Sequence, residues 1–184
     1  MFLEAEVWTI ARTDKGNAVL IRPLEGTLAV PIFIGSLEAQ NILLGMGDME
    51  IPRPLTHDLM LSILQLLGSE VVQVEIHTIK DGTFFANIVL MRDGGRTAVD
   101  ARPSDALALA VRTHCPVFID EAIVEEVGIP VSSVKSGETH EPLAPETPGK
   151  SEKQDLEEAL AKSVAEENYE EAARLRDRLK KLES

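Results

Sequence analysis

Apolar side chains in the first part of the chain occur in short runs that are separated by turn residues. Residues 2–12, 18–21 and 27–34 are rich in β-branched and aromatic residues, and segments containing Gly16 and Gly26 lie between them. Runs of this length between glycine-containing turns are typical of antiparallel strands joined by tight connections. We therefore expect the chain to begin with antiparallel strands.

Two later segments have helical spacing instead. Ser36 precedes apolar residues that fit one helix face, and Thr56–Leu67 is aliphatic almost all round and is followed by Gly68. Serine and threonine are preferred N-caps, and glycine commonly follows a helix end. The pattern predicts two helices with Ser36 and Thr56 as N-caps, and the glycines and prolines of residues 45–54 predict a loop between them.

The next region returns to alternation. Residues 71–79 place Val72, Val74, Ile76 and Thr78 on one side of a strand, and Asp-Gly turns at 81–82 and 93–94 predict two further strands, 84–91 and 96–101. The remaining elements are a helix at 105–113, a strand at 117–119 and a helix at 120–127 that ends at Gly128. Strands lead and helices are interspersed irregularly. This order predicts an α+β fold with a mixed or antiparallel sheet rather than repeating βαβ units.

The composition changes at about residue 135. Residues 136–150, SGETHEPLAPETPGK, contain almost nothing to bury, so they predict a flexible linker between a domain of residues 1–135 and a second unit of residues 151–184. In that unit apolar residues recur every four positions and are interrupted at Asn168, which predicts a small helical hairpin. A hairpin of this size buries little surface alone, so we expect it to bind another copy or a protein partner.

Charge narrows the possible partners. The formal net charge is −13, so attraction of the whole molecule to nucleic acid or to an anionic membrane is not expected, and any nucleic-acid contact has to be local or metal-assisted. Cys115 is the only cysteine, which excludes an intramolecular disulfide. No apolar run approaches the roughly 18 residues of a membrane span. We expect a cytoplasmic protein.

Two segments share an unusual pattern at predicted helix starts: Arg53-Pro54-Leu55-Thr56-His57-Asp58 and Arg102-Pro103-Ser104-Asp105. In each, an Arg-Pro pair precedes a hydroxyl residue, and an aspartate lies at the start of an apolar helix. Capping and helix-dipole effects explain the hydroxyl residues and the aspartates. They do not explain the arginines, the histidine or the additional Asp100.

We hypothesise that the two helix N-termini converge on one polar pocket. Free backbone N–H groups, arginines and carboxylates together suit a phosphate and a divalent metal. The assigned roles are catalysis by His57, Asp58 and Asp105; phosphate binding by Arg53, Arg102, Thr56 and Ser104; and Mg²⁺ or Mn²⁺ binding by Asp58, Asp100 and Asp105. The competing account is structural: an Arg102–Asp105 ion pair that fixes the corner between strand and helix.

Other polar residues have simpler explanations. His77 falls on the polar side of a strand, and His114 and Cys115 lie at a helix end, where surface and capping roles predominate. Glu38 lies in the first turn of a predicted helix and is expected to interact with the helix dipole. The alternative is that it joins the acidic cluster.

Four motifs, in this order along the chain, resemble those of a known family. VPIFIGSLEAQNI, RPLTHDLMLSIL, DGTFFANIVL and DARPSDALALAVR, the last followed by PVFI, closely resemble the bifunctional nuclease domain, found in bacteria and plants. The resemblance covers about residues 1–135. It implies a compact α+β domain that forms homo-oligomers, commonly dimers, and, from plant members, cleavage of DNA and RNA.

The C-terminal unit also resembles a known motif. LEEALAKSVAEENYEEAARLRDRLKKLE is similar to the UVR motif of the UvrB and UvrC excision-repair proteins, a helical hairpin used for protein–protein contact. Asn168 and Tyr169 stand where an acidic residue and phenylalanine are more usual. The resemblance implies a protein partner for residues 151–184.

Two functional hypotheses follow. The first is a nuclease that hydrolyses phosphodiester bonds of DNA or RNA with metal assistance. The second is a non-enzymatic oligomeric adaptor for DNA repair or proteolysis, which the acidic charge and the lack of a basic groove favour, because a nuclease without electrostatic attraction loses affinity and association rate.

Overall fold

The structure is a computed structural model that describes residues 1–13, 16–47 and 51–134. The predicted linker and helical hairpin lie outside the described residues. None of the helices within these ranges has the length and apolarity that a membrane span requires.

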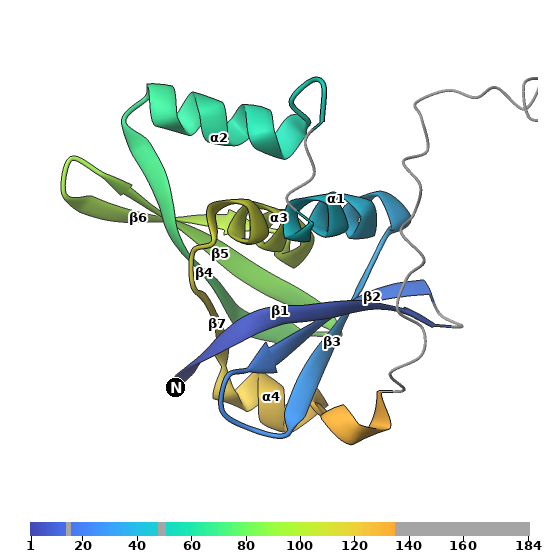
Figure 1. Cartoon of the computed structure of the whole chain (residues 1–184). Coiled ribbons are helices and arrows are strands. Elements are labelled where there is room, and N and C mark those ends of the chain that lie inside the picture. The colour runs from blue at the N-terminus through green and yellow to red at the C-terminus, as the bar shows by residue number, and fades with distance from the viewer. Residues whose placement is uncertain (14–15, 48–50, 135–184) are drawn as a thin grey trace, which may run out of the picture. The chain divides into compact units, whose positions relative to one another are not determined.

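The described residues form one mixed sheet of eight strands, in the order β6-β5-β4-β7-β1-β2-β3-β8 (Figure 1). The strands are β1 (Phe2–Thr13), β2 (Gly16–Pro23), β3 (Leu28–Ile34), β4 (Ser69–Lys80), β5 (Thr83–Arg92), β6 (Gly95–Ala101), β7 (Val117–Asp120) and β8 (Ile129–Pro130). Strands β4 and β7 pair in parallel, and the other neighbours are antiparallel. The α+β prediction is therefore confirmed.

The Asp-Gly turns fix the β4–β5–β6 meander. Asp81 and Gly82 have φ angles of 51° and 74°, and Asp93 and Gly94 have 49° and 76°. Positive φ at two consecutive residues suits the tight hairpin turn for which Asp-Gly is a preferred sequence. These turns were predicted at the correct residues.

The helices are α1 (Ser36–Met46), α2 (Thr56–Leu66), α3 (Pro103–Thr113) and α4 (Glu121–Val127), and Val131–Ser133 form a short 3₁₀ turn. Figure 1 shows α1, α2 and α3 on one side of the sheet and α4 on the other. Helix α3 is the most enclosed, because it packs against α1, α2, β4 and β5. Its residues 106–110 are all buried.

The helix caps differ from the prediction. Gly35, Leu55 and Arg102 occupy the N-cap positions of α1, α2 and α3, and none of them makes a side-chain cap hydrogen bond. Ser36 and Thr56 are the first residues of their helices, and Ser104 is the second residue of α3. All three cap assignments were therefore wrong. For Ser104 the reason is that proline at position 103 starts α3 one residue before the serine, as proline's fixed φ permits.

Two further predictions need correction. Gly45 was assigned to a loop, but α1 continues through it, and the residue is buried where α1 approaches α3. The sequence pattern predicted that Val72 lies on the same face of β4 as Val74, but the register shifts between Val71 and Gln73. This bulge makes Val71 the buried residue instead, because an extra residue reverses the alternation of the preceding part of the strand.

Candidate active site

The two Arg-Pro motifs meet where α2 and α3 begin. His57 is the second residue of α2 and Asp105 the third residue of α3, and His57 Nε2 lies 3.7 Å from Asp105 Oδ1. His57 is only 9% exposed, whereas the Asp105 side chain is 36% exposed. The contact therefore runs from the interior to the surface.

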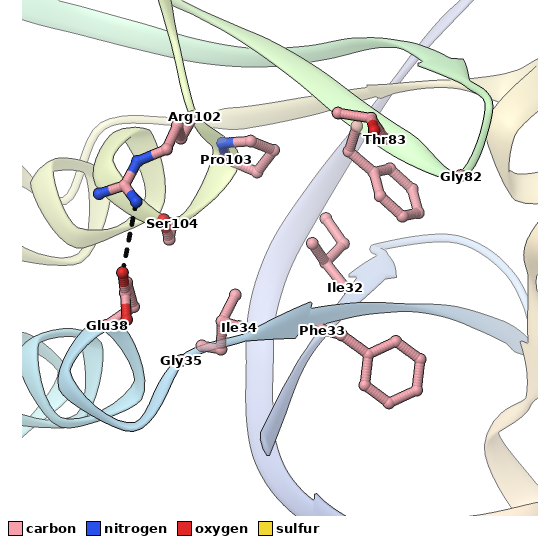
Figure 2. A pocket seen from close by; sticks show the side chains of 11 residues that line it. Ile32, Phe33, Ile34, Gly35, Glu38, Gly82, Thr83, Arg102, Pro103 and Ser104 are labelled. Carbon is pink, nitrogen blue, oxygen red and sulfur yellow. Dashed lines mark hydrogen bonds and ion pairs between the residues drawn. The ribbon is translucent and has the colours of Figure 1, made fainter. Parts of the chain in front are cut away.

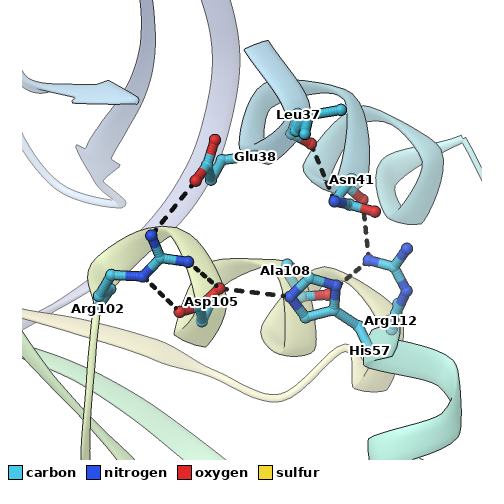
Figure 3. A network of polar contacts seen from close by, with 8 residues as sticks. All are labelled: Leu37, Glu38, Asn41, His57, Arg102, Asp105, Ala108 and Arg112. Atoms are coloured by element: carbon cyan, nitrogen blue, oxygen red, sulfur yellow. Dashed lines mark hydrogen bonds and ion pairs between the residues drawn. The ribbon is translucent and has the colours of Figure 1, made fainter. Parts of the chain in front are cut away.

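Arg102 extends this contact toward solvent (Figure 3). Its Nε donates to Asp105 Oδ2 at 2.8 Å and its Nη2 to Oδ1 at 3.1 Å, which is a bidentate pair, and its Nη1 donates to Glu38 Oε1 at 3.3 Å. The hydrogen bonds and charge of Asp105 raise the pKa of Arg102 above its usual range. The result is a chain of polar contacts from Glu38 through Arg102 and Asp105 to His57.

Asp58 belongs to a second, more enclosed network. Its Oδ1 accepts from Arg112 Nε at 2.7 Å, and its Oδ2 accepts from the Leu55 backbone N–H at 2.8 Å. Arg112 Nη1 also donates to the carbonyl oxygens of Asn41 and Ala108, at 2.9 and 2.8 Å. The Arg112 side chain is 8% exposed. This cluster joins α1, α2 and α3, so the geometry gives Asp58 a structural position.

The pKa of Asp58 reflects this environment. Partial burial acts to raise it, but the hydrogen bonds from Arg112 and the Leu55 amide and the positive charge of Arg112 outweigh burial and hold the pKa below its ordinary value. The carboxylate is therefore ionised at neutral pH and committed to Arg112.

Arg112 was missed by the sequence reasoning. The available signal was an arginine in a helix whose other positions are mostly apolar, spaced seven residues after Asp105 and four after Ala108, on one helical face. A charge at such a position requires a partner. The sequence could not identify Asp58 as that partner, because 54 positions separate the two residues.

The other predicted residues are not brought into the His57–Asp105 contact. Asp100 lies on β6 opposite Asn87 and is exposed, Arg53 is exposed in the segment before α2, and Thr56 is exposed at the start of α2. Within the described ranges no three His, Cys, Asp or Glu side chains gather closely enough to hold a metal ion. Asp58, Asp100 and Asp105 therefore do not form a ready-made metal site.

A pocket of about 350 Å³ lies beside the Arg102–Glu38 pair (Figure 2). Arg102, Ser104 and Glu38 supply polar groups, and the remaining lining is largely apolar, from β3, the β4–β5 turn, Phe84 and Pro103. Ser104 is buried at the wall of this pocket. Polar groups that converge on a concave, partly apolar surface can orient a small ligand.

His57 carries a buried polar atom that is not satisfied. Among the described residues, its Nδ1 is buried without a hydrogen-bond partner. An orphaned buried nitrogen costs roughly 1–3 kcal/mol. Such a cost is expected at functional positions more than at purely structural ones.

Comparison with known proteins gives the family. Residues 19–132 match the bifunctional nuclease domain, which is well over half of the chain. The chain belongs to the bifunctional nuclease domain family. Residues 150–184 match the UvrB/UvrC motif and lie outside the described part of the structure.

Relatives of this bifunctional nuclease domain include an uncharacterised bacterial protein and named plant nucleases. An uncharacterised protein of Mycobacterium tuberculosis is 38% identical over 120 residues, which are 65% of this chain and 71% of that protein. Bifunctional nuclease 2 of Arabidopsis thaliana is 26% identical over 190 residues, covering 91% of this chain and 56% of the plant protein. Bifunctional nuclease 1 of Oryza sativa subsp. japonica is 22% identical over 178 residues, covering 89% and 54%. The chain thus spans about half the length of these plant relatives.

The weaker candidates have separate outcomes. His114 is the left-handed C-cap of α3, with φ 53°, as the capping interpretation predicted. Burial raises the pKa of the Cys115 thiol, which disfavours the reactive thiolate. Glu38 pairs with Arg102, which neither of its two predicted roles included.

Proposed function

We propose that this bifunctional nuclease domain hydrolyses phosphodiester bonds in DNA or RNA at the Arg102–Asp105–His57 chain. The observation that carries the proposal is the convergence of two helix N-termini on a histidine–aspartate–arginine contact beside a pocket. Family membership and the names of the plant relatives support the same reaction.

Arg102 is the proposed phosphate ligand. Its side chain is 67% exposed, lines the pocket, and lies at the positive end of α3. Guanidinium groups and helix N-termini both favour phosphate oxygens. Because Arg102 Nη1 is only 3.3 Å from Glu38, a bound phosphate competes with Glu38 for that donor.

His57 is the proposed proton acceptor for the attacking water, through Nε2, because Nδ1 is buried. The water oxygen bonds to phosphorus, the P–O bond to the leaving group breaks, and the imidazolium returns the proton to the leaving oxygen. Its Nε2 faces Asp105, and a carboxylate at that position stabilises the imidazolium that forms when the ring takes a proton. Asp105 is held in place by both donors of Arg102. Ser104, in the pocket wall, is a second candidate donor to the phosphate.

Metal dependence is a separate part of the proposal. Since the described residues show no three-ligand cluster, we assign no residue to a metal. Activity is expected to require Mg²⁺ or Mn²⁺. Nicking in the presence of either ion, with and without excess chelator, tests this expectation.

The decisive experiment compares variants of the full chain. Nicking of supercoiled plasmid and cleavage of single-stranded RNA are measured for His57→Ala and Asp105→Asn, with thermal unfolding of each variant. The proposal expects activity to fall at least 100-fold in both variants, with unfolding unchanged for Asp105→Asn and a moderate loss of stability for His57→Ala, because His57 is buried. Asp81→Asn is the control, because Asp81 is exposed in the β4–β5 turn and asparagine tolerates its positive φ. Unchanged cleavage by both variants would remove the proposed site.

A second candidate function is a non-enzymatic adaptor. Two observations favour it: the net charge of −13, which opposes binding of nucleic acid, and the match to the UvrB/UvrC motif at residues 150–184. In this case the chain retains one stoichiometric protein partner, and deletion of residues 151–184 abolishes retention. Purified protein that never cleaves nucleic acid under any metal condition would favour the adaptor over the nuclease.

A further inference from the structure

Strand β6 ends the sheet and is open to solvent. Its only strand neighbour among the described elements is β5, and residues 95–100 are all exposed. An edge strand presents unpaired N–H and C=O groups, which makes it a template for pairing with another strand. Natural proteins usually protect such an edge, so its exposure here needs an explanation.

The apolar side chains near this edge are also uncovered. Val99 lies opposite Ile88, so it points to the same face of the sheet as that core residue, yet it is 42% exposed. On this face α2 packs against β4, which is two strands away from β6. Helix α2 and the residue after it expose five large apolar side chains: Leu59, Met60, Ile63, Leu66 and Leu67. A single copy leaves these apolar side chains exposed.

The charges of β6 are symmetric about its middle. Arg96 and Asp100 are equally spaced from Ala98, and all three point to the face opposite Val99, because side chains alternate along a strand. If a second β6 pairs antiparallel with Ala98 opposite Ala98, each Arg96 lies opposite the Asp100 of the other copy. Opposite charges directly across two strands stabilise the pairing. Neither side chain has an ion-pair partner among the residues that the structure describes.

The family resemblance already implies dimers, and we propose the surface that forms them: β6 pairs antiparallel with β6 of a second copy of this chain, centred on Ala98, and the partner copy covers the apolar face of α2. The self-complementary Arg96 and Asp100 select a second copy over an unrelated strand. Two copies of net charge −13 repel each other at long range. The Arg96–Asp100 pairs provide a local attraction that opposes this repulsion. This inference is independent of the proposed hydrolysis, and it gives Asp100 a role other than the metal binding expected from the sequence.

Charge reversal tests the pairing. The mass of the full chain is measured by light scattering across a concentration series, for Arg96→Asp, Asp100→Arg and the double variant. The wild type is expected to be a dimer, and each single variant to weaken dimerisation at least 10-fold, because each places like charges opposite each other. The double variant restores two opposite-charge pairs and is expected to dimerise like the wild type.

The rescue cannot arise within one copy. Residues 96 and 100 are separated by four strand positions, about 13 Å, so they do not contact each other in the monomer. The matched control reverses the charges of the exposed Lys80 and Glu25, which lie outside β6 and α2. A monomeric wild type, single variants that dimerise normally, or a double variant that stays monomeric would each overturn the proposal.

The helix part of the surface has its own test. Leu66 is 87% exposed, so Leu66→Ser is expected to leave the fold of the monomer unchanged, as circular dichroism checks. It should still weaken dimerisation, because it removes apolar surface from the contact. Dimerisation equal to that of the wild type would exclude α2 from the interface.

Discussion

Arg112 joins three helices through one guanidinium group. It pairs with Asp58 of α2 and donates to the carbonyl oxygens of Asn41 in α1 and Ala108 in its own helix. Removing one partner from a buried ion pair lowers stability more than replacing both partners, because the remaining charge is buried without compensation. At the residue scale, this cluster rather than the exposed Arg102–Asp105 pair is expected to control stability.

Asp58→Ala is therefore expected to be strongly destabilising. It leaves Arg112 buried without its carboxylate and also frees the Leu55 amide. We expect a loss of about 3 kcal/mol, at the low end of the range for buried pairs because Asp58 is one-third exposed. Urea unfolding of the full chain measures it. Asp105→Ala is the comparison, and an equal or larger loss there would show that the exposed network holds the fold instead.

The same carboxylate predicts a dependence of stability on pH. The folded-state pKa of Asp58 is lower than its unfolded value, so its contribution is fully present above the unfolded pKa. It is lost as the pH falls from about 4 through the folded pKa. The free energy of unfolding of the wild type should thus fall more steeply in this window than that of Asp58→Asn. Parallel curves for the two proteins would contradict the assignment.

At the scale of elements, turn chemistry could be predicted and close contacts could not. The Asp-Gly turns specify their own backbone conformation, so the β4–β5–β6 meander follows from local sequence. The burial of Gly45 depends on its packing against α3, and the burial of Arg112 depends on an ion-pair partner 54 positions away. Neither contact is visible in the local sequence. Of the candidate site, the meeting of the two helix starts could be predicted, but the separation of Asp58, Asp100 and Asp105 could not, because it depends on how the helices and sheet pack.

Gly45 sets the distance between α1 and α3. A Cβ at this position would lie 2.5 Å from Val111 Cγ2 and 2.9 Å from Arg112 Nη1, closer than ordinary contacts. Gly45→Ala should therefore destabilise the protein by about 1–3 kcal/mol, although alanine is the better helix former. Thermal unfolding measures this effect. The control is Gly47→Ala, just past the helix end, where φ is −90° and a side chain is tolerated; a stabilised Gly45→Ala would show that the helices separate without cost.

At the scale of the whole molecule, the acidic charge and the proposed phosphate site make opposing demands. A protein that covers many phosphates with a basic groove releases many counterions, so its affinity falls steeply as salt rises. Here the net charge is −13, and Arg102 is the one cationic side chain at the pocket that is proposed to contact phosphate. Binding that depends on one local contact releases few counterions.

The salt dependence of nucleic-acid binding is therefore expected to be shallow. A single phosphate contact predicts a slope of about −0.9 for log affinity against log salt, compared with about −10 for a protein with many contacts. Fluorescence anisotropy with a labelled oligonucleotide measures the slope between low and physiological salt. Arg102→Ala should weaken binding and bring the slope toward zero, whereas Arg92→Ala, at the exposed end of β5, should change neither. A steep slope that survives Arg102→Ala would place the nucleic-acid contact on another surface of the molecule.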